Sequence, residues 1–351
     1  MNLSEIQTPA VVIDLDKVDA NLGRAQTFID QLGMRMRPHV KTHKLPLFAR
    51  QQIALGAVGI TCQKLGEAEA MADGGIEDIF LPYNILGEAK LDRLAALHDR
   101  VCLSVTADSA YTIAGYAARF EAARPLKVLV ECETGMDRCG VQTAEEAVNL
   151  ARQIAAAPGL RFGGLMTYPP PGQGLRTNEW LADAKAKLEA AGLPPEVISV
   201  GGSPDLYKAA EMQVATEYRP GTYIYSDRMQ VAWGHGTLQD CAMTVKATVV
   251  SRPRPDRAVL DCGSKALAAD LSQSPGHGHL TAYPDAVITR LTEEHAVVDL
   301  SSSEARPEIG ETVWVIPNHA CVVSNLFDFV YLARGEHEVE KALVTSRGAL
   351  T

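Results

Sequence analysis

The segment Leu126-Lys127-Val128-Leu129-Val130 is a short apolar run of the kind that forms a buried strand, and a helix-like segment, Ala144 to Ala156, follows it. The same alternation recurs along the first two thirds of the chain. The further apolar runs are Val58 to Thr61, Asp78 to Leu81, Val101 to Val105, Phe162 to Met166 and Val197 to Val200. The further helix-like segments are Leu65 to Ala72, Lys90 to His98, Ser109 to Arg119 and Trp180 to Ala191.

Strands that alternate with helices of this length predict βαβ units and a parallel sheet. Roughly eight such units fit, which is the number that a (β/α)8 barrel needs. A doubly wound sheet is the alternative, but the sequence lacks the Gly-rich turn of dinucleotide-binding sheets. We therefore predict an α/β fold in which residues 10–235 form a (β/α)8 TIM-like barrel.

The pattern changes near residue 236, where β-like runs punctuated by Pro and Gly replace helical periodicity. These runs are Val245 to Ser251, Ala258 to Asp261, Ala286 to Leu291, His295 to Asp299 and Thr312 to Ile316. We predict that residues 236–351, with residues 1–9, form a C-terminal all-β domain. The early run from Pro9 to Asp14 could belong to either part.

The composition is typical of a globular protein, with 351 residues, 46% hydrophobic and 22% charged. A net charge of -10 argues against a nucleic-acid partner. No apolar run reaches the length of a membrane span, and the segment Met1 to Ile6 has no features of a signal peptide. The seven cysteines are scattered and odd in number, which indicates reduced thiols and a cytoplasmic location.

A basic segment, Arg37-Pro38-His39-Val40-Lys41-Thr42-His43-Lys44, follows a short β-like run at Met34 to Arg37. A helix is expected to begin near Pro46. Lys41 therefore stands at a strand end, where a lysine can point into a pocket and condense with an aldehyde cofactor. The alternative is a basic, solvated turn.

In a (β/α)8 barrel the active site lies at the carboxyl ends of the strands, so the polar residues at these ends are candidates. They are Lys41, Gln63, Lys64, Glu131, Glu133, Asp137, Arg138, Thr167, Tyr168, the turn Gly201 to Ser203, and Arg219 to Tyr223. The Gly-containing turns after the late strands can cradle a phosphate. Together with a lysine and an arginine, they indicate pyridoxal phosphate (PLP).

Three of these motifs together resemble those of the alanine racemase-like, fold-type III PLP enzymes. They are Lys41 in its Pro-His-x-Lys-x-His context, Glu133 to Val141, and Arg219 to Tyr223. The segment Pro317 to Leu326 resembles the D-threonine aldolase and D-serine dehydratase branch of this group. The resemblance covers nearly the whole chain, and it implies a homodimer in which each β domain completes the partner's active site.

The resemblance also implies a role for each matched residue in the barrel. Lys41 would bind PLP covalently and act as the base at the substrate Cα. Arg138 would hydrogen-bond near the phenolic oxygen of the cofactor, with an ion pair to Glu133 or Asp137 as the alternative. Tyr168 would pack beside the pyridine ring, with an ordinary core tyrosine as the alternative.

The remaining cofactor contacts would come from the turns after the last two strands. Ser203, Gly202, Gly221 and Thr222 would bind the phosphate. Arg219 would contact the pyridine nitrogen, with Glu217 as its rival. An arginine there would not give up its proton to the ring, so it would leave PLP a weaker electron sink.

His319 and Cys321 form a His-x-Cys pair late in the chain. Imidazole and thiolate are good zinc ligands, and residues two apart on a strand face the same side. Two protein ligands suit an open, catalytic site better than a closed structural one. With the resemblance, we expect a divalent ion (zinc, manganese or magnesium) that binds the substrate β-hydroxyl. The alternative is a buried histidine beside an inert cysteine.

We therefore predict a lyase that acts on small D-β-hydroxy-α-amino acids, foremost a D-threonine aldolase that forms glycine and acetaldehyde. The runner-up is a dehydratase, since His-x-Cys is familiar from D-serine dehydratases. In addition, the loop Pro169 to Gln173 lacks a histidine that some aldolases carry there. A racemase would need a second base, for which Tyr283 and Tyr331 are unconvincing, and non-catalytic PLP-binding proteins usually lack the β domain.

Overall fold

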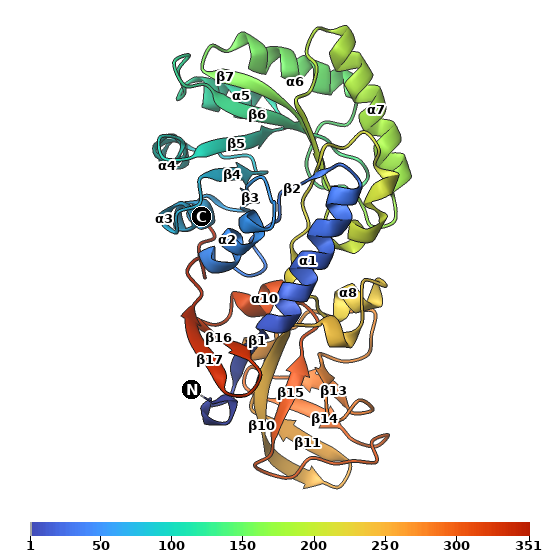
Figure 1. Ribbon diagram of the computed structural model, residues 1–351. Coiled ribbons are helices and arrows are strands. Elements are labelled where there is room, and N and C mark those ends of the chain that lie inside the picture. The colour runs from blue at the N-terminus through green and yellow to red at the C-terminus, as the bar shows by residue number, and fades with distance from the viewer. Residues whose placement is uncertain (1) are drawn as a thin grey trace. The chain divides into compact units, whose positions relative to one another are not determined.

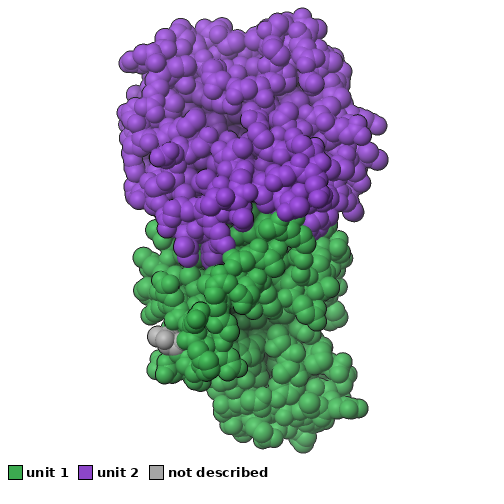
Figure 2. Space-filling view, in the orientation of Figure 1, with its two compact units in different colours: residues 1–24, 42–45, 222–348 green, residues 25–41, 46–221, 349–351 purple. Residues whose placement is uncertain are grey.

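The computed structural model describes residues 2–351. Contacts within the chain divide it into two compact units (Figure 2). Unit 1 comprises Met1–Arg24, Thr42–Leu45 and Thr222–Gly348, and unit 2 comprises Ala25–Lys41, Pro46–Gly221 and Ala349–Thr351.

Unit 2 contains eight strands, all paired in parallel, with helices between them (Figure 1). The strands are β2 (Arg35–Met36), β3 (Ile60–Thr61), β4 (Asp78–Leu81), β5 (Cys102–Ala107), β6 (Leu126–Glu131), β7 (Leu160–Met166), β8 (Val197–Val200) and β9 (Glu217–Tyr218). The helices are α2 (Pro46–Ala54), α3 (Leu65–Asp73), α4 (Glu88–His98), α5 (Ala110–Ala117), α6 (Ala144–Ala156), α7 (Gly174–Ala190) and the 3-10 helix η2 (Ser203–Glu211).

The strand order is β2-β9-β8-β7-β6-β5-β4-β3, and a parallel bridge between His39 and Thr61 joins its two ends. Val40 N–H donates to Thr61 O at 2.9 Å, and Thr61 N–H donates to Pro38 O at 2.8 Å. Because Pro38 has no N–H to donate, β2 itself is short although the chain keeps its strand path beyond it. The predicted (β/α)8 barrel is confirmed.

Local sequence explains why the strands and helices of unit 2 form where they do. Strand β6 is apolar along most of its length because a parallel strand of a barrel is covered on both faces. Helix α6 begins with a capping box, in which Thr143 and Glu146 each accept a backbone N–H of the other. Its buried stripe includes Ala147, Ala151 and Ile154, and it lies beside α7 (Figure 1).

Unit 1 is built on a mostly antiparallel sheet in the order β13-β14-β11-β10-β1-β16-β17, with β15 pairing β10 and β12. The strands are β1 (Ala10–Asp14), β10 (Met243–Arg254), β11 (Arg257–Leu260), β12 (His279–Leu280), β13 (Val287–Leu291), β14 (Ala296–Asp299), β15 (Thr312–Ile316), β16 (Phe329–Arg334) and β17 (Glu338–Leu343). Its short helices are η1 (Leu3–Glu5), η3 (Thr222–Ile224), α8 (Arg228–Ala232), η4 (Leu238–Asp240), α9 (Ser264–Leu267) and α10 (Ala320–Ser324). Helix α1 (Leu15–Gln31) begins in unit 1 and ends in unit 2.

The early strand, whose place the sequence left open, belongs to the sheet of unit 1. Strand β1 pairs antiparallel with β10, with Ala10 opposite Lys246, and parallel with β16. Residues 10–24 and 222–235, which we had included in the predicted barrel range, lie in unit 1. No helix among residues 2–351 is both long and apolar enough to cross a membrane.

Gly164 in β7 has no room for a side chain, and this leads to a stability prediction. Its φ is +129°, and a Cβ would run into the backbone of Val197 in β8. Gly164→Ala should lower the free energy of unfolding by about 2 kcal/mol or more, measured by urea denaturation. Gly23→Ala is the control, because Gly23 lies in α1 with open space around it. This substitution should leave the free energy of unfolding unchanged or raise it slightly. Equal effects of the two substitutions would contradict the prediction.

Candidate active site

Lys41 follows the barrel strand at the point where the ring of strands closes. His39 N–H donates to Pro220 O at 2.8 Å, so the backbone just before Lys41 is bonded on both sides. The ring of His39 lies 2.9 Å from Gln63 Oε1. The next three residues, Thr42 to Lys44, are buried, whereas Lys41 itself is exposed and lies in a turn. The structure therefore presents an exposed lysine in a turn that directly follows the hydrogen-bonded strand path.

The turns after β8 and β9 bring several of the predicted phosphate ligands together. Gly221 N–H donates to Ser203 Oγ at 3.0 Å. A Cβ on Gly202 would lie 2.6 Å from the ring of Tyr168, so only glycine fits against this tyrosine. Thr222 belongs to unit 1, where its Oγ1 lies 3.3 Å from Cys321 Sγ. The geometry thus groups Tyr168, Gly202, Ser203 and Gly221 in unit 2.

A line of buried polar groups crosses the interior of the barrel. Arg37 Nε donates to Glu217 at 2.8 Å, and Ser199 Oγ donates to the other oxygen of Glu217 at 2.6 Å. Arg219 donates to Ser199 Oγ at 2.6 Å and to Thr167 O at 2.8 Å. Burial lowers the pKa of Arg219 to about 10, so it stays protonated at neutral pH. Burial would raise the pKa of Glu217, but Arg37 holds it below its ordinary value.

Arg138 lies beside Glu131, the last residue of β6, and beside Tyr168, which follows β7. Its guanidinium is 5.2 Å from the ring centroid of Tyr168 and 4.0 Å from a carboxylate oxygen of Glu131. The side chain of Glu133 instead accepts hydrogen bonds from the backbone N–H groups of Gly135 and Arg138, so it stabilises the loop in which it lies. The ion pair of Arg138 is therefore with Glu131, at the end of β6, and we had not foreseen this partner.

His319 and Cys321 lie at the start of a helix, so our expectation that they share a strand was wrong. His319 directly precedes α10 without a capping hydrogen bond from its side chain, and Cys321 is in the first turn of this helix. The two side chains are still hydrogen-bonded to each other, and this bond, together with Asp270, raises the pKa of His319 to about 9. The Sγ of Cys321 also lies 3.1 Å from Thr42 Oγ1.

Two carboxylates support this pair, and neither was found from the sequence. Asp270 Oδ2 lies 2.6 Å from His319 Nδ1, which fixes that ring nitrogen. Asp227 accepts Gln230 N–H in α8 and Ala320 N–H in α10, both at 2.9 Å. Asp227 therefore ties the two helices together. Residues 2–351 contain no cluster of three or more histidine, cysteine or carboxylate side chains with metal-site geometry.

Known families cover both units of the chain. Residues 13–229 match the alanine racemase N-terminal domain family, and residues 242–333 match a serine dehydratase domain family. The chain belongs to the alanine racemase-like PLP enzymes, in their D-threonine aldolase and D-serine dehydratase branch. Members of this branch that resemble the chain are PLP-dependent lyases of D-β-hydroxy amino acids, and the chain is such an enzyme.

The similar proteins include both aldolases and a dehydratase. The chain is 33% identical to the D-threonine aldolase of an Arthrobacter species, over 95% of this chain and 90% of that one. It is 32% identical to the D-threo-3-hydroxyaspartate dehydratase of a Delftia species, over 93% of each chain. The structure of a D-threonine aldolase from Filomicrobium marinum superposes with a TM-score of 0.93 and 32% identity, covering 100% of this chain and 98% of that one.

Glu131 leads to a prediction about the pH dependence of stability. Burial raises its pKa from 4.5 to about 7, so the folded protein holds a proton that the unfolded chain releases. The free energy of unfolding therefore falls as the pH rises from 4.5 to about 7, because the folded state must then carry a buried carboxylate. Glu131→Gln should remove up to about 3 kcal/mol of this loss, measured by urea unfolding at about pH 5 and about pH 8.

The control for this measurement is Glu304→Gln, which changes an exposed carboxylate. It should leave the pH dependence of the wild-type protein unchanged. If Glu131→Gln and the wild-type protein lose stability equally between the two pH values, Glu131 does not titrate in this window.

Proposed function

We propose that this chain is a PLP- and divalent-metal-dependent D-threonine aldolase that cleaves D-threonine to glycine and acetaldehyde. The observation that carries the proposal is the likeness to D-threonine aldolases across both units, in sequence and in fold. The proposed enzyme is a cytoplasmic homodimer, in keeping with the scattered free cysteines and with the resemblance.

The side chains of the barrel fit PLP. Lys41 would hold the aldehyde carbon of the cofactor, and Ser203, Gly202 and Gly221 would surround its phosphate. At Gly202 a larger side chain is excluded by Tyr168. Thr222, the residue after Gly221, is the remaining phosphate ligand in this proposal. When bound, PLP supplies an electron sink for the bond that breaks at Cα.

Arg219 is the better candidate for the pyridine nitrogen because its rival is already engaged. Both oxygens of Glu217 accept hydrogen bonds, one from Arg37 and one from Ser199. Arg219 has five N–H groups and uses two of them in the hydrogen bonds to Ser199 and Thr167. It would donate a further one to the ring nitrogen and keep its own proton.

Arg138 and Tyr168 would bind the remaining face and edge of the cofactor. Arg138 is half-exposed and could donate to the phenolic oxygen, while Glu131 holds its guanidinium from behind. Tyr168 would pack beside the pyridine ring. In the aldolase reaction these residues would orient the cofactor, the substrate β-hydroxyl would lose its proton as the carbon–carbon bond breaks, and Lys41 would deliver one proton to Cα to complete glycine.

His319 and Cys321 fit a divalent ion. Imidazole and thiolate are preferred ligands of zinc, and a carboxylate behind the histidine, here Asp270, is the usual support of a metal-binding ring. Manganese and magnesium are the alternatives, but they prefer oxygen ligands to a thiolate, so a pair that includes Cys321 favours zinc. An ion there would lower the pKa of the substrate β-hydroxyl and help to release its proton.

A dehydratase is the second candidate, and one observation favours it. Structures of D-threo-3-hydroxyaspartate dehydratase are described as a histidine-to-alanine mutant and as a cysteine-to-alanine mutant in the metal-free form. The two mutated positions are two residues apart, as His319 and Cys321 are. In this reaction Lys41 would remove the Cα proton, and the β-hydroxyl would leave.

A product assay decides between the two reactions. Purified protein with PLP and either zinc or manganese should convert D-threonine to glycine and acetaldehyde. Formation of 2-oxobutanoate would instead establish dehydration, and formation of L-threonine or L-allothreonine would establish racemisation. Lys41→Ala should reduce the rate by on the order of a thousandfold or more, and borohydride should attach PLP to Lys41 in the wild-type protein. Lys90→Ala, which changes an exposed lysine of α4, is the control and should stay within a few-fold of wild type.

Metal content tests the second part of the proposal. Cys321→Ala should lose bound zinc, measured by elemental analysis after dialysis, and should keep PLP, measured by absorbance. Cys102→Ala removes another accessible thiol and should keep both. Full zinc occupancy in Cys321→Ala would show that the ion, if bound, lies elsewhere.

A further inference from the structure

Arg228, the first residue of α8, is a buried cation that pairs with no carboxylate among residues 2–351. Its Nη1 donates to Asn318 Oδ1 at 2.7 Å, and its Nη2 donates to the carbonyl oxygen of Pro275 at 2.9 Å. Both acceptors are neutral, and only 8% of the residue is exposed. Because burying a charge without an opposite charge is costly, such an arginine points to a task that repays this cost.

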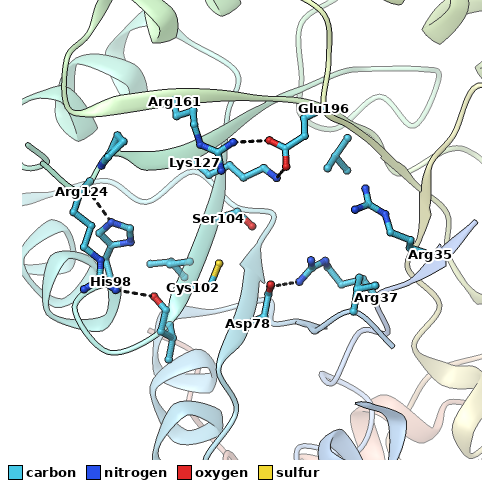
Figure 3. Close-up of a pocket in the computed structure, with 15 residues that line it drawn as sticks. Arg35, Arg37, Asp78, His98, Cys102, Ser104, Arg124, Lys127, Arg161 and Glu196 are labelled. Atoms are coloured by element: carbon cyan, nitrogen blue, oxygen red, sulfur yellow. Dashed lines mark hydrogen bonds and ion pairs between the residues drawn. The ribbon is translucent and has the colours of Figure 1, made fainter. Parts of the chain in front are cut away.

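Basic side chains elsewhere in the chain show the usual compensation. In a cavity of about 490 Å³ at the amino ends of the barrel strands, Lys127 and Arg161 both pair with Glu196 (Figure 3). Arg228 instead uses its planar set of N–H groups to bridge two neutral acceptors from different segments. Its contacts therefore hold chain segments together rather than balance a charge.

The segments that are held include the loop of residues 268–278, which contains no helix or strand. Asn318 Nδ2 donates to the carbonyl oxygens of Asp270 and Gly276, both at 2.9 Å. The carbonyl of Pro275, bound by the arginine, is a third point of attachment. All these residues belong to unit 1.

The middle of the 268–278 loop has little apolar packing that could hold it instead. Leu271 is 68% exposed, and Gln273 is exposed as well. The position of the loop therefore depends on the hydrogen bonds from Arg228 and Asn318. The bond from Arg228 to Oδ1 also orients the Asn318 amide, so that its Nδ2 faces the loop.

The 268–278 loop bears on the candidate active site because it carries Asp270. Asp270 Oδ2 lies 2.6 Å from His319 Nδ1, while the main chain of Asp270 is bound by Asn318, the residue before His319. The carboxylate occupies Nδ1 and leaves Nε2 as the ring nitrogen that can bind a metal ion.

We propose that Arg228 is a positioning residue for the metal site: through Asn318 it holds the 268–278 loop, so that Asp270 fixes the ring of His319. This inference rests on the metal ion of the proposed function. Arg228 acts at a distance, since none of its hydrogen bonds reaches His319 or Cys321. Losing a group that supports a metal ligand typically weakens metal binding by roughly ten- to a hundredfold.

A cleavage experiment tests the hold on the loop in PLP-loaded protein from which metal has been removed. Chymotrypsin cleaves after leucine, and the exposed Leu271 lies in the loop. Arg228→Met should be cut after Leu271 on the order of tenfold faster than the wild-type protein, because the lost hydrogen bonds no longer hold the loop closed. Mass spectrometry of the fragments locates the cut.

Asn318→Asp is a second variant for this experiment, and it serves also if Arg228→Met fails to fold. It keeps an acceptor for Arg228 but replaces the N–H donor toward the loop by an oxygen, so it should be cut faster as well. Arg252→Met is the matched control, because Arg252 is a partly buried arginine of unit 1 that pairs with Glu308, and its rate should be that of the wild-type protein. Unchanged cleavage in both test variants, or faster cleavage in the control too, would overturn the proposal.

Zinc affinity, measured by competition with a chelator, tests the link to the metal site. Arg228→Met should bind zinc roughly ten- to a hundredfold more weakly, and Arg252→Met should bind it as the wild-type protein does. Asp270→Ala should weaken binding at least as much. The double variant Arg228→Met, Asp270→Ala should be no weaker than Asp270→Ala alone, because both changes act through one contact. Additive effects would mean that Arg228 acts by another route and would refute the positioning role.

The wild-type protein separates a failure of this inference from a failure of the proposed function. If it binds no more zinc than Cys321→Ala does, the metal part of the proposed function fails and the metal role of Arg228 falls with it. The cleavage rates then still decide whether Arg228 holds the loop. If the wild-type protein binds zinc and Arg228→Met binds it equally well, only the role of Arg228 is refuted.

Discussion

The line of hydrogen bonds from Arg37 through Glu217 and Ser199 to Arg219 holds the interior of the barrel together. Glu217 and Arg219 are almost fully buried, so each needs its partners, and removing one member of a buried ion pair costs on the order of 3–5 kcal/mol. Arg37 also pairs with Asp78 at the amino ends of the strands, whereas Arg219 follows the carboxyl end of β9. The two ends of the barrel are therefore positioned by one shared set of charges.

Backbone hydrogen bonds at the point where the barrel closes also fix the position of Lys41. Pro38 cannot donate, so the strand path passes to His39 and Val40, whose N–H groups bond to opposite neighbours, Pro220 and Thr61. The residue that follows is Lys41. A group that is to hold a cofactor covalently gains from a support of this kind, because a hydrogen-bonded backbone directly before it fixes its reach better than a free loop would.

The sequence predicted the barrel because buried parallel strands read as largely apolar runs, such as Leu126 to Val130. Its motif also singled out Lys41, whose role stays a prediction. It failed where a distant residue decides the local structure. Residues 320–324 are rich in β-branched and small side chains and look like a strand, but Asp227, far away in the sequence, caps them as a helix. Asp270 and Glu131 were also missed as partners, since nothing near them in the sequence indicates His319 or Arg138.

The relatives raise two separate questions: which bond of the substrate breaks, and which β-substituent the enzyme accepts. An aldolase and a dehydratase are about equally similar to this chain, so overall similarity leaves open which bond breaks. Substrate choice is a different matter, because 3-hydroxyaspartate carries a β-carboxylate where threonine carries a methyl group, and a carboxylate needs a cation. Arg228 is held by Asn318, the residue before His319, and by the carbonyl of Pro275, both of which are neutral. The charge of Arg228 is thus met by no carboxylate among residues 2–351, and His319 and Cys321 stay the proposed ligands of the metal ion.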